Sequence, residues 1–413
     1  MKAAALIIFS LAFGYRIWLN RLQARSKRNP VPANVADVYD EAAYQKWRAY
    51  QTEKLSHSLL ADSCAFAVQL AMLATDAYAW FAALFPEGWV WRSFAVVLLG
   101  AVGDLAALPF AWRDTMEIEA KYGFNRATKQ TFWTDQVKEF VIGLALSLGI
   151  ACLLGGLHRW LGDGVLAAFA VALFALALLI SFLYPWLSRI FNRFTPLEEG
   201  ELKEKLTALL EKHGFTVRAI QVMDASRRTT KSNAYFTGFG KMKTIVLYDN
   251  LVRTMTPDEI CAVFAHEMGH GLHRDTLKNQ ALAFVQMAIL AVLAWLTLRT
   301  QEVFSAFGFT EVNYAFAVIL IMSVGFALIS PLYGLLTNWR SRRAEYAADA
   351  QAAQEGCGEA LVSGLKKLAR ENLSDLSPSP LLVKLEYSHP TLSQRIAAIE
   401  GAAAESAEKV PSV

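Results

Sequence analysis

Seven stretches of this 413-residue chain are apolar and long enough to cross a lipid bilayer as helices. A membrane-spanning helix needs about 20 residues to cross the hydrocarbon core. With 54% hydrophobic and only 19% charged residues, the chain has too little polar surface for a soluble protein of this length. The sequence therefore predicts a mainly α-helical, multi-pass membrane protein, with spans at residues 3–19, 59–85, 94–112, 140–157, 165–184, 281–298 and 315–336.

The connections between these stretches differ in charge. The first stretch follows Lys2 but has no small-x-small cleavage site after it, so we expect a retained span and not a signal peptide. The loop after span one carries seven basic residues: Arg21, Arg25, Lys27, Arg28, Lys46, Arg48 and Lys54. The loop after span three carries five: Arg113, Lys121, Arg126, Lys129 and Lys138. The alternate connections carry only one each: Arg92, Arg159 and Arg299. Because basic loops stay in the cytosol, we expect an external N-terminus and cytosolic polar regions at 185–280 and 337–413.

The remaining composition excludes two classes of site. A formal net charge of +3 is too small to indicate binding of nucleic acid. The four cysteines lie far apart without a CxxC pair, which is typical neither of a disulfide framework nor of a thiolate metal site. Cys261 is expected to be an apolar filler on its helix.

Acidic and amide side chains recur inside the second and third spans. Asp62, Gln69 and Asp76 are seven residues apart and share a helix face, and Asp104 lies in span three. Charged groups in hydrocarbon cost a few kcal/mol each, so this face should meet protein or water. Two interpretations stay open, a hydrogen-bonded helix interface and the wall of a water-filled chamber.

The strongest motif is His266-Glu-Met-Gly-His270. A helix that begins with Thr256 as N-cap and Pro257 at its first position places the two histidines one turn apart on one face. Two imidazoles at this spacing bind one zinc ion, and the adjacent Glu267 reaches the attacking water. The alternative is a pair of structural core histidines.

A catalytic zinc site needs a third protein ligand and one open position. His273 lies about 10 Å along the helix axis from His266, at 1.5 Å per residue, which is too far to share an ion easily. Glu345 is the better candidate, and Asp349 follows it by one helical turn, where it suits the N–H of a ligating histidine. The alternative for Glu345 is an exposed acid held by neighbouring arginines.

Several segments together resemble one known family, the type I CAAX prenyl endopeptidases. The similarity rests on HExxH and on residues 232–240 (SNAYFTGFG), 243–251 (KTIVLYDNL), 341–349 (SRRAEYAAD), 387–395 (YSHPTLSQR), 121–126 (KYGFNR) and 194–200 (FTPLEEG). The resemblance covers residues 39–400. It implies seven transmembrane helices around a chamber, one Zn²⁺ per chain, and a cytosolic site that cleaves near the C-terminus of isoprenylated CAAX proteins.

The same resemblance implies roles for residues that the sequence alone leaves undecided. His389 and Arg395 are candidates to stabilise the oxyanion, although by themselves they indicate only a turn and a final helix. Residues 233–251 predict a β-hairpin around a turn at 238–240. Asn233 and Ala234 would lie on its edge and pair with an extended substrate, and the alternative is a purely structural hairpin.

These expectations divide the chain into five parts. They are transmembrane helices one to five (1–184), a cytosolic catalytic part with the hairpin and HExxH helix (185–280), helices six and seven (281–336), a second catalytic part (337–400), and a disordered tail (401–413).

Three functions compete at this point. The first is a CAAX-type zinc metalloendopeptidase, the second a membrane quality-control metalloprotease, and the third a non-enzymatic membrane protein with a structural zinc site. The expected partners are a peptide or protein substrate, with or without a prenylated C-terminus, and the lipid bilayer, without nucleic acid. The sequence favours a bacterial inner membrane over the endoplasmic reticulum.

Overall fold

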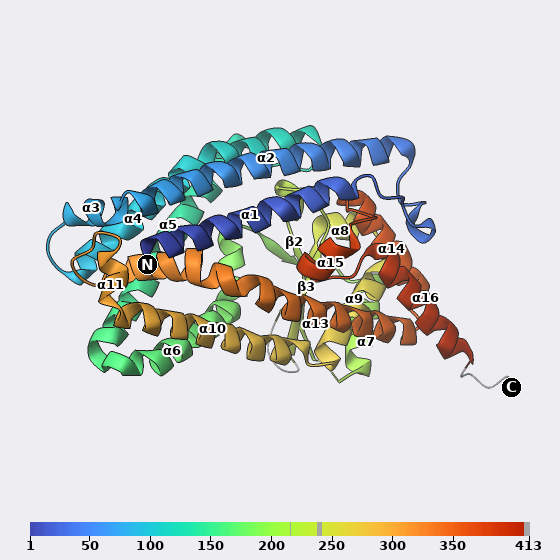
Figure 1. The fold of residues 1–413 in the computed structure, drawn as a ribbon. Helices are drawn as coiled ribbons and strands as arrows, with labels where there is room; N and C mark the ends of the chain where they lie inside the picture. Colours follow the sequence, from blue (N-terminus) through green and yellow to red (C-terminus); the bar gives the residue numbers. More distant parts are fainter. Residues whose placement is uncertain (215, 238–241, 409–413) are drawn as a thin grey trace.

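A computed structural model describes residues 1–214, 216–237 and 242–408. Long helices lie roughly parallel, and a small sheet with shorter helices gathers at one end of them, opposite the N-terminus (Figure 1). The long helices are α1 (Lys2–Ser26), α2 (Glu41–Ala74), α4 (Trp89–Trp112), α5 (Lys129–Leu161), α6 (Val165–Leu187), α10 (Asp275–Arg299) and α13 (Phe326–Gln354). A mainly helical fold is thus confirmed.

Six helical stretches among the described residues are long and apolar enough to cross a membrane. One of them, Lys129–Leu183, is 55 residues long and contains two of the expected spans. The turn Gly162–Gly164 separates these two, and Gly162 adopts φ 53°, a conformation that favours glycine. All seven apolar segments are therefore helical, although the count of seven spans is not confirmed as such.

The second span differs from its expected length. Helix α2 ends at Ala74, and Asp76 has a left-handed backbone with φ 58° before the short helix α3 (Ala77–Ala83) begins. The expectation of one span over 59–85 is wrong at its C-terminal end. An apolar run continues through this turn, so hydrophobicity alone did not reveal the break.

The polar face of α2 pairs mainly with α1. Asp76 contacts Lys2 at 2.7 Å and Asp62 contacts Arg16 at 3.1 Å. Gln69 accepts a hydrogen bond of 2.7 Å from the Tyr78 hydroxyl. These contacts favour the helix-interface interpretation of the three residues, because each polar group has a protein partner.

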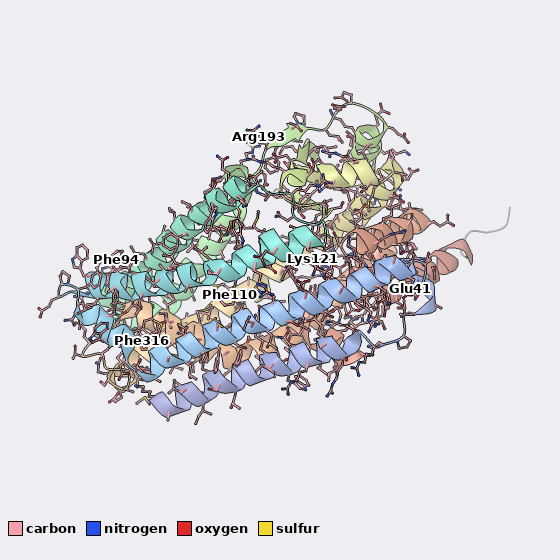
Figure 2. All side chains as sticks on the ribbon, turned by 90° about the horizontal axis from the view of Figure 1, so that it is seen from above. Glu41, Phe94, Phe110, Lys121, Arg193 and Phe316 are labelled. Atoms are coloured by element: carbon pink, nitrogen blue, oxygen red, sulfur yellow. The ribbon has the colours of Figure 1, made fainter. Side chains whose placement is uncertain are left out.

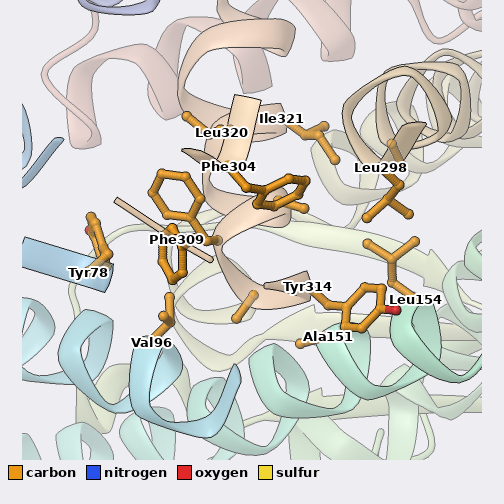
Figure 3. Close-up of a cluster of buried hydrophobic side chains, with 14 of the residues drawn as sticks. Tyr78, Val96, Ala151, Leu154, Leu298, Phe304, Phe309, Tyr314, Leu320 and Ile321 are labelled. Carbon is orange, nitrogen blue, oxygen red and sulfur yellow. The ribbon is translucent and has the colours of Figure 1, made fainter. Parts of the chain in front are cut away.

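A large apolar core closes the end of the bundle that lies far from the sheet. Phe304 and Phe309 belong to one cluster with Tyr78 and Leu154 (Figure 3), and Phe316 packs on Phe309 in the same cluster. These residues join α3 and α5 to α11 (Gln301–Ser305) and α12 (Tyr314–Leu320). A π-helical turn, η6 (Ile321–Gly325), connects α12 to α13.

The basic connections and the sheet lie at the same end of the bundle. Figure 2 labels Glu41 and Lys121 near this end, and Phe94 and Phe316 at the other. The π-helical turn η2 (Arg113–Glu119) ends at Glu119, whose carboxylate lies 3.4 Å from Lys231 in the polar region.

The sheet has four strands in the order β1-β2-β4-β3. They are β1 (Phe194–Pro196), β2 (Thr216–Met223), β3 (Ala234–Thr237) and β4 (Met242–Tyr248). Strands β3 and β4 pair antiparallel, as the expected hairpin requires, whereas β2 and β4 are parallel. The turn expected at 238–240 lies outside the described residues, and β3 forms one edge of the sheet.

Short helices surround the sheet at this end. They are α7 (Glu201–Lys212), α8 (Asp249–Thr254), α9 (Pro257–Leu272), α14 (Gly358–Glu371), α15 (Pro380–Glu386) and α16 (Leu392–Glu408). Helix α16 continues to Glu408, so the described part of the expected disordered tail is helical. The remaining residues of that tail, 409–413, lie outside the described part of the chain.

Helix α9 begins at the expected N-cap, Thr256, which forms a capping box with Glu259. The Glu259 backbone N–H bonds to Thr256 Oγ1 at 3.3 Å, and Glu259 Oε2 accepts the Thr256 N–H at 2.9 Å. Lys367 and Ser363 of α14 also donate to this buried carboxylate, at 2.7 and 2.6 Å. Burial raises the pKa of Glu259, but these hydrogen bonds outweigh burial and lower the pKa.

Glu259→Gln is therefore expected to destabilise the protein by about 1–2 kcal/mol, which thermal unfolding in detergent would measure as a lower midpoint. Because the folded-state pKa lies below the unfolded-state pKa, the carboxylate contributes stability above about pH 4.3, and this stability is lost as the pH falls through the folded-state pKa. The difference between variant and wild type should shrink in acid. A difference that grows below pH 4 would contradict this account.

Candidate active site

The site forms where α9 crosses α13. Gly269 of α9 lies so close to α13 that an added Cβ would come within 2.9 Å of Ala348 Cα. Only glycine permits this approach, because a larger residue would meet backbone atoms. The close crossing brings His266 and His270 of α9 toward Glu345 of α13.

These three side chains form the one group of metal-ligand type found among the described residues. His266 Nε2 lies 3.5 Å from Glu345 Oε2, and His270 Nε2 lies 3.3 Å from Glu345 Oε1. Ligand atoms of a tetrahedral zinc site are about 3.3 Å apart, given metal–ligand distances of about 2.0–2.1 Å. Both histidine–carboxylate distances are near this value, and ligand atoms of all three residues lie within 4.8 Å of one another, so the group could hold one metal ion.

The donor atoms also fit a metal chemically. Glu345 is 5% exposed, and its Oε2 atom has no hydrogen-bond partner among the described residues. Arg395 Nη1 and His266 Nε2 lie 3.5 Å from this oxygen without forming a hydrogen bond, so a bound metal ion would compensate the buried carboxylate directly. A set of two histidines and one glutamate leaves one position of a tetrahedral ion open, as catalysis requires.

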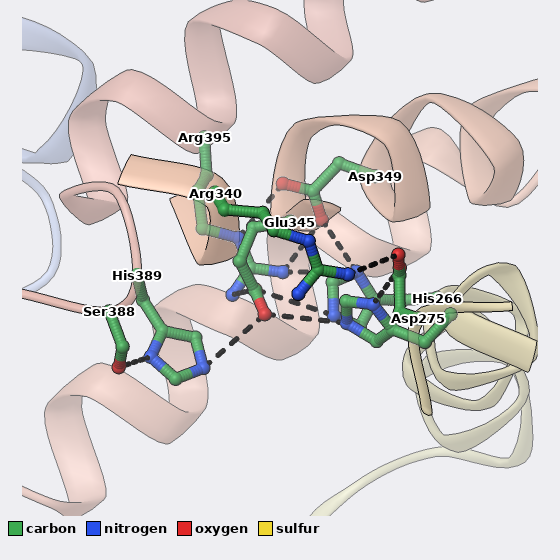
Figure 4. A network of polar contacts seen from close by, with 9 residues as sticks. His266, Asp275, Arg340, Glu345, Asp349, Ser388, His389 and Arg395 are labelled. Carbon is green, nitrogen blue, oxygen red and sulfur yellow. Dashed lines mark hydrogen bonds and ion pairs between the residues drawn. The ribbon is translucent and has the colours of Figure 1, made fainter. Parts of the chain in front are cut away.

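Asp349 lies where the sequence places it. Its Oδ1 atom is 2.8 Å from His266 Nδ1, and the residue is fully buried. The carboxylate accepts the Nδ1–H, which leaves the Nε2 lone pair of His266 free to bind a metal. Figure 4 shows this contact beside Glu345.

Asp275 has the same relation to the second histidine, and our sequence reasoning missed it. Its Oδ2 atom lies 3.1 Å from His270 Nδ1, at the start of α10 (Figure 4). Burial lowers the pKa of His270, but the hydrogen bonds to Glu345 and Asp275 outweigh burial and raise the pKa to about 9. The sequence signal for this contact was an acidic residue five positions after the second histidine. The left-handed backbone at Arg274 directs the Asp275 carboxylate back to the His270 ring.

Replacing Asp275 with asparagine is expected to lower metal affinity by about 10–100-fold, because His270 loses the partner that fixes its tautomer. Titration with a competing chelator would measure this change. The matched control is Lys278→Gln. The Lys278 side chain is 55% exposed, lies outside the cluster and contacts Asp275 at 3.4 Å. Equal affinity in wild type and Asp275→Asn would show that the carboxylate does not support the ligand.

His273 does not join the metal-ligand group. It follows the end of α9 as its C-terminal cap and is absent from the cluster of His266, His270 and Glu345. That His273 is not a ligand stays a prediction. The buried Cys261 packs in the apolar core beside α9, as expected for a filler.

Glu267 lies between His266 and His270 in the sequence of α9 and is partly buried. It makes no hydrogen bond or ion pair with the residues that the structure describes. A carboxylate in this position, unengaged by neighbouring side chains, is free to accept a proton from water.

Arg395 and His389 both reach Glu345, but in different surroundings. Arg395 donates two hydrogen bonds to Asp349, of 2.9 and 2.6 Å, and its side chain is 12% exposed. His389 Nε2 lies 3.3 Å from Glu345 Oε1, and its side chain is 63% exposed. Arg395 is thus engaged by the buried carboxylate, while His389 faces the open side of the cluster.

Asn233 and Ala234 lie at the start of the edge strand β3. The Asn233 carbonyl accepts the Tyr248 N–H of β4 at 3.0 Å. Because peptide groups alternate along a strand, the Ala234 N–H points away from β4, where it bonds to Asn233 Oδ1 at 2.9 Å. No hydrogen bond or ion pair joins these two residues to the metal cluster within the described part of the chain.

Comparisons with known proteins extend over nearly the whole chain. The model of peptidase family M48 matches residues 196–403, and that of the CAAX prenyl protease N-terminal region, five membrane helices, matches 20–193. The chain is 30% identical over 409 residues to the CAAX prenyl protease 1 homolog of Arabidopsis thaliana, covering 94% of each chain. It is also 30% identical over 433 residues to CAAX prenyl protease 1 of Saccharomyces cerevisiae, covering 95% of this chain and 94% of the relative.

A solved structure gives the same result for the fold. The crystal structure of S. mikatae Ste24p superposes with a TM-score of 0.90 at 27% identity, covering 97% of this chain and 99% of that one.

Proposed function

Because this chain belongs to peptidase family M48, as an integral-membrane metalloprotease of the CAAX prenyl protease type, we propose that it cleaves prenylated CAAX proteins near their C-terminus. Membership of this family contradicts the interpretation as a non-enzymatic membrane protein. The observation that carries the proposal is the cluster of His266, His270 and Glu345, with Glu267 between the two histidines.

The metal of this site is zinc in our proposal. Two imidazoles and one carboxylate around an open position are a donor set that catalytic zinc uses. When bound, zinc would polarise the scissile carbonyl and bring the pKa of water to about 7. One ion per chain corresponds to the single ligand cluster among the described residues.

Glu267 carries out the proton transfers. As general base it takes a proton from the attacking water, and it returns this proton to the leaving amine as the peptide bond breaks. Asp349 and Asp275 hold the Nδ1–H of His266 and His270, so both Nε2 atoms face the metal position. Arg395 in turn fixes Asp349 through its paired hydrogen bonds.

The oxyanion is stabilised mainly by His389 in this proposal. Its exposure and its 3.3 Å distance from Glu345 suit a donor that meets the substrate at the open side. Arg395 contributes positive charge from behind Glu345, at 3.5 Å. Its engagement with Asp349 supports positioning more than direct contact with substrate.

The substrate is held in extended form along β3. The outward Ala234 N–H and the exposed edge offer main-chain hydrogen bonds, which tolerate varied side chains. Without substrate, Asn233 Oδ1 accepts the hydrogen bond of this N–H. A substrate strand that pairs there would therefore displace the Asn233 side chain.

The protein is a multi-pass membrane protein, and we place its active site in the cytosol. The site lies at the end of the bundle that carries the basic connections, which supports this orientation. The relatives compared above are eukaryotic and give no support to the bacterial inner membrane that the sequence favours.

Cleavage of two matched peptides tests the substrate. Purified protein would be incubated with a farnesylated CAAX peptide and with the same peptide unmodified, and mass spectrometry would locate the cut. We expect release of the last three residues from the farnesylated peptide. Equal cleavage of both would reject the prenyl requirement and favour a broader membrane peptidase, while cleavage of neither, with the metal bound, would reject CAAX substrates.

A further inference from the structure

A cavity of about 750 Å³ opens beside the ends of two membrane helices. The start of α5, the segment after α6 and the short turn η5 (Ala225–Arg227) line it, and Figure 2 labels one lining residue, Arg193. It shares no residue with the metal cluster. The cavity is therefore a separate feature of the molecule.

The lining is strongly basic. Six cationic side chains and one carboxylate give a net charge of +5, against +3 for the whole chain. The one carboxylate, Asp135, accepts two hydrogen bonds from Arg228, of 2.8 and 3.2 Å. Four cations have no carboxylate partner among the described residues: Arg126, Arg189, Arg193 and Arg227. Like charges this close repel one another, so the cavity favours an anion.

Further donors point to a phosphate in particular. The N-terminus of α5, a helix of 33 residues, lies in the lining with Thr128 as its N-cap. The positive end of the helix dipole attracts anions there, and hydroxyl groups of Thr131 and Thr134 add donors. Arginine guanidinium groups match the geometry of phosphate oxygens.

The position of the cavity indicates a lipid as the source of the phosphate. The rings of Trp112, Phe132 and Trp133 pack together near the start of α5, adjacent in sequence to the cavity residue Thr131, as aromatic side chains do where helices leave a bilayer. Exposed apolar side chains continue from the cavity along the helices. Val141 lies one helical turn beyond the cavity residue Lys138, and the exposed Ile190 lies beside Lys138, whose Nζ donates to the Ile190 carbonyl. An acyl chain could follow this apolar path while its head group lies in the basic cavity.

We propose that this cavity binds the phosphate head group of an anionic phospholipid. Basic pockets between membrane helices on the cytosolic side are suited to such head groups. A soluble phosphate compound offers the same chemistry without the acyl chains, and an acidic peptide segment offers carboxylates instead. Neither of these uses the apolar path along α5.

Native mass spectrometry of protein released from nanodiscs tests the proposal. The nanodiscs would contain phosphatidylcholine with or without phosphatidylglycerol, and retained lipids would be counted for the wild type and for Arg189→Gln/Arg193→Gln/Arg227→Gln. None of these arginines lies in the catalytic machinery. We expect wild type to retain phosphatidylglycerol and the triple variant to bind it about tenfold or more weakly, since each surface cation contributes to attraction of anionic lipid.

Two matched variants separate the cavity from general surface charge. Arg21→Gln/Arg25→Gln/Arg28→Gln removes the same charge from the end of α1 and should retain the lipid. Substitution of the three cavity arginines by lysine keeps the charge and should retain most of the binding, which also controls for folding. Equal losses in both glutamine variants would overturn the proposal, as would retention of phosphatidylcholine and phosphatidylglycerol to the same extent.

Competition distinguishes the sources of the anion. Inorganic phosphate at millimolar concentration should leave the retained lipid in place, because it lacks the acyl chains. Displacement of the lipid by inorganic phosphate would assign the cavity to soluble phosphates, and displacement by a poly-glutamate peptide would assign it to an acidic protein segment. Either displacement would overturn the lipid assignment.

Discussion

Replacing Glu267 with glutamine is expected to lower kcat for peptide cleavage by about 10²–10⁴-fold while zinc stays bound. The amide has nearly the same shape but cannot accept the proton of the attacking water. The proposed metal ligands His266, His270 and Glu345 are unchanged, and Glu267 bonds to none of them among the described residues. Metal analysis and cleavage of a farnesylated peptide, made on the same preparation, would measure both quantities.

The matched control for this variant is Glu259→Gln. It makes the same chemical change on the same helix, but at a carboxylate that accepts hydrogen bonds from Lys367 and Ser363. It should lower stability and leave kcat nearly unchanged below the unfolding temperature. Full activity in Glu267→Gln would remove this residue as the base, and loss of zinc together with activity would instead make it a structural support of the site.

Replacing Glu345 with glutamine is expected to weaken zinc binding by about 100-fold or more, with a corresponding loss of activity at limiting zinc. Changes to the partners of metal ligands already cost about 10–100-fold, and Glu345 is placed as a ligand itself. The buried Oε2 atom without a hydrogen-bond partner is the observation behind this expectation. Equilibrium dialysis against buffered zinc would measure the affinity.

Thermal unfolding provides a second measurement for the same variant. A ligand that binds only the folded state stabilises it, so chelation should lower the unfolding midpoint of the wild type. Glu345→Gln should respond little to the chelator, because it binds little metal. His273→Gln is the control, since His273 lies outside the cluster and should keep both the zinc and the response. A normal chelator response in Glu345→Gln would contradict its role as ligand.

The membrane helices and the pair of histidines in the candidate metal site followed from local patterns. Runs of about 20 apolar residues are sufficient to specify helices that cross a bilayer, since backbone groups must bond within the segment. The spacing of His266 and His270 placed both rings on one helix face, and the capping box at Thr256 located the start of that helix. Both features depend on residues a few positions apart.

Other features depended on contacts between distant segments. The sequence left the polar face of α2 undecided, because nothing local indicates that Lys2 and Arg16 of α1 lie against Asp76 and Asp62. Asp275 was missed for a similar reason, since the turn at Arg274 determines whether the carboxylate reaches His270. The hydrogen bonds of Arg395 to Asp349, which join α16 to α13, were not predicted either, and its role at the oxyanion stays a prediction.

By itself, therefore, the sequence determined the helical membrane fold, the two histidines and Glu267, because helix periodicity and hydrophobicity act over one or two turns. The tertiary structure decided which distant carboxylates and cations complete the site. Gly269 lets α9 and α13 approach closely enough for Glu345 to meet both histidines. Such contacts between helices depend on packing geometry at sites far apart in the chain, and no local pattern of residues specifies that geometry.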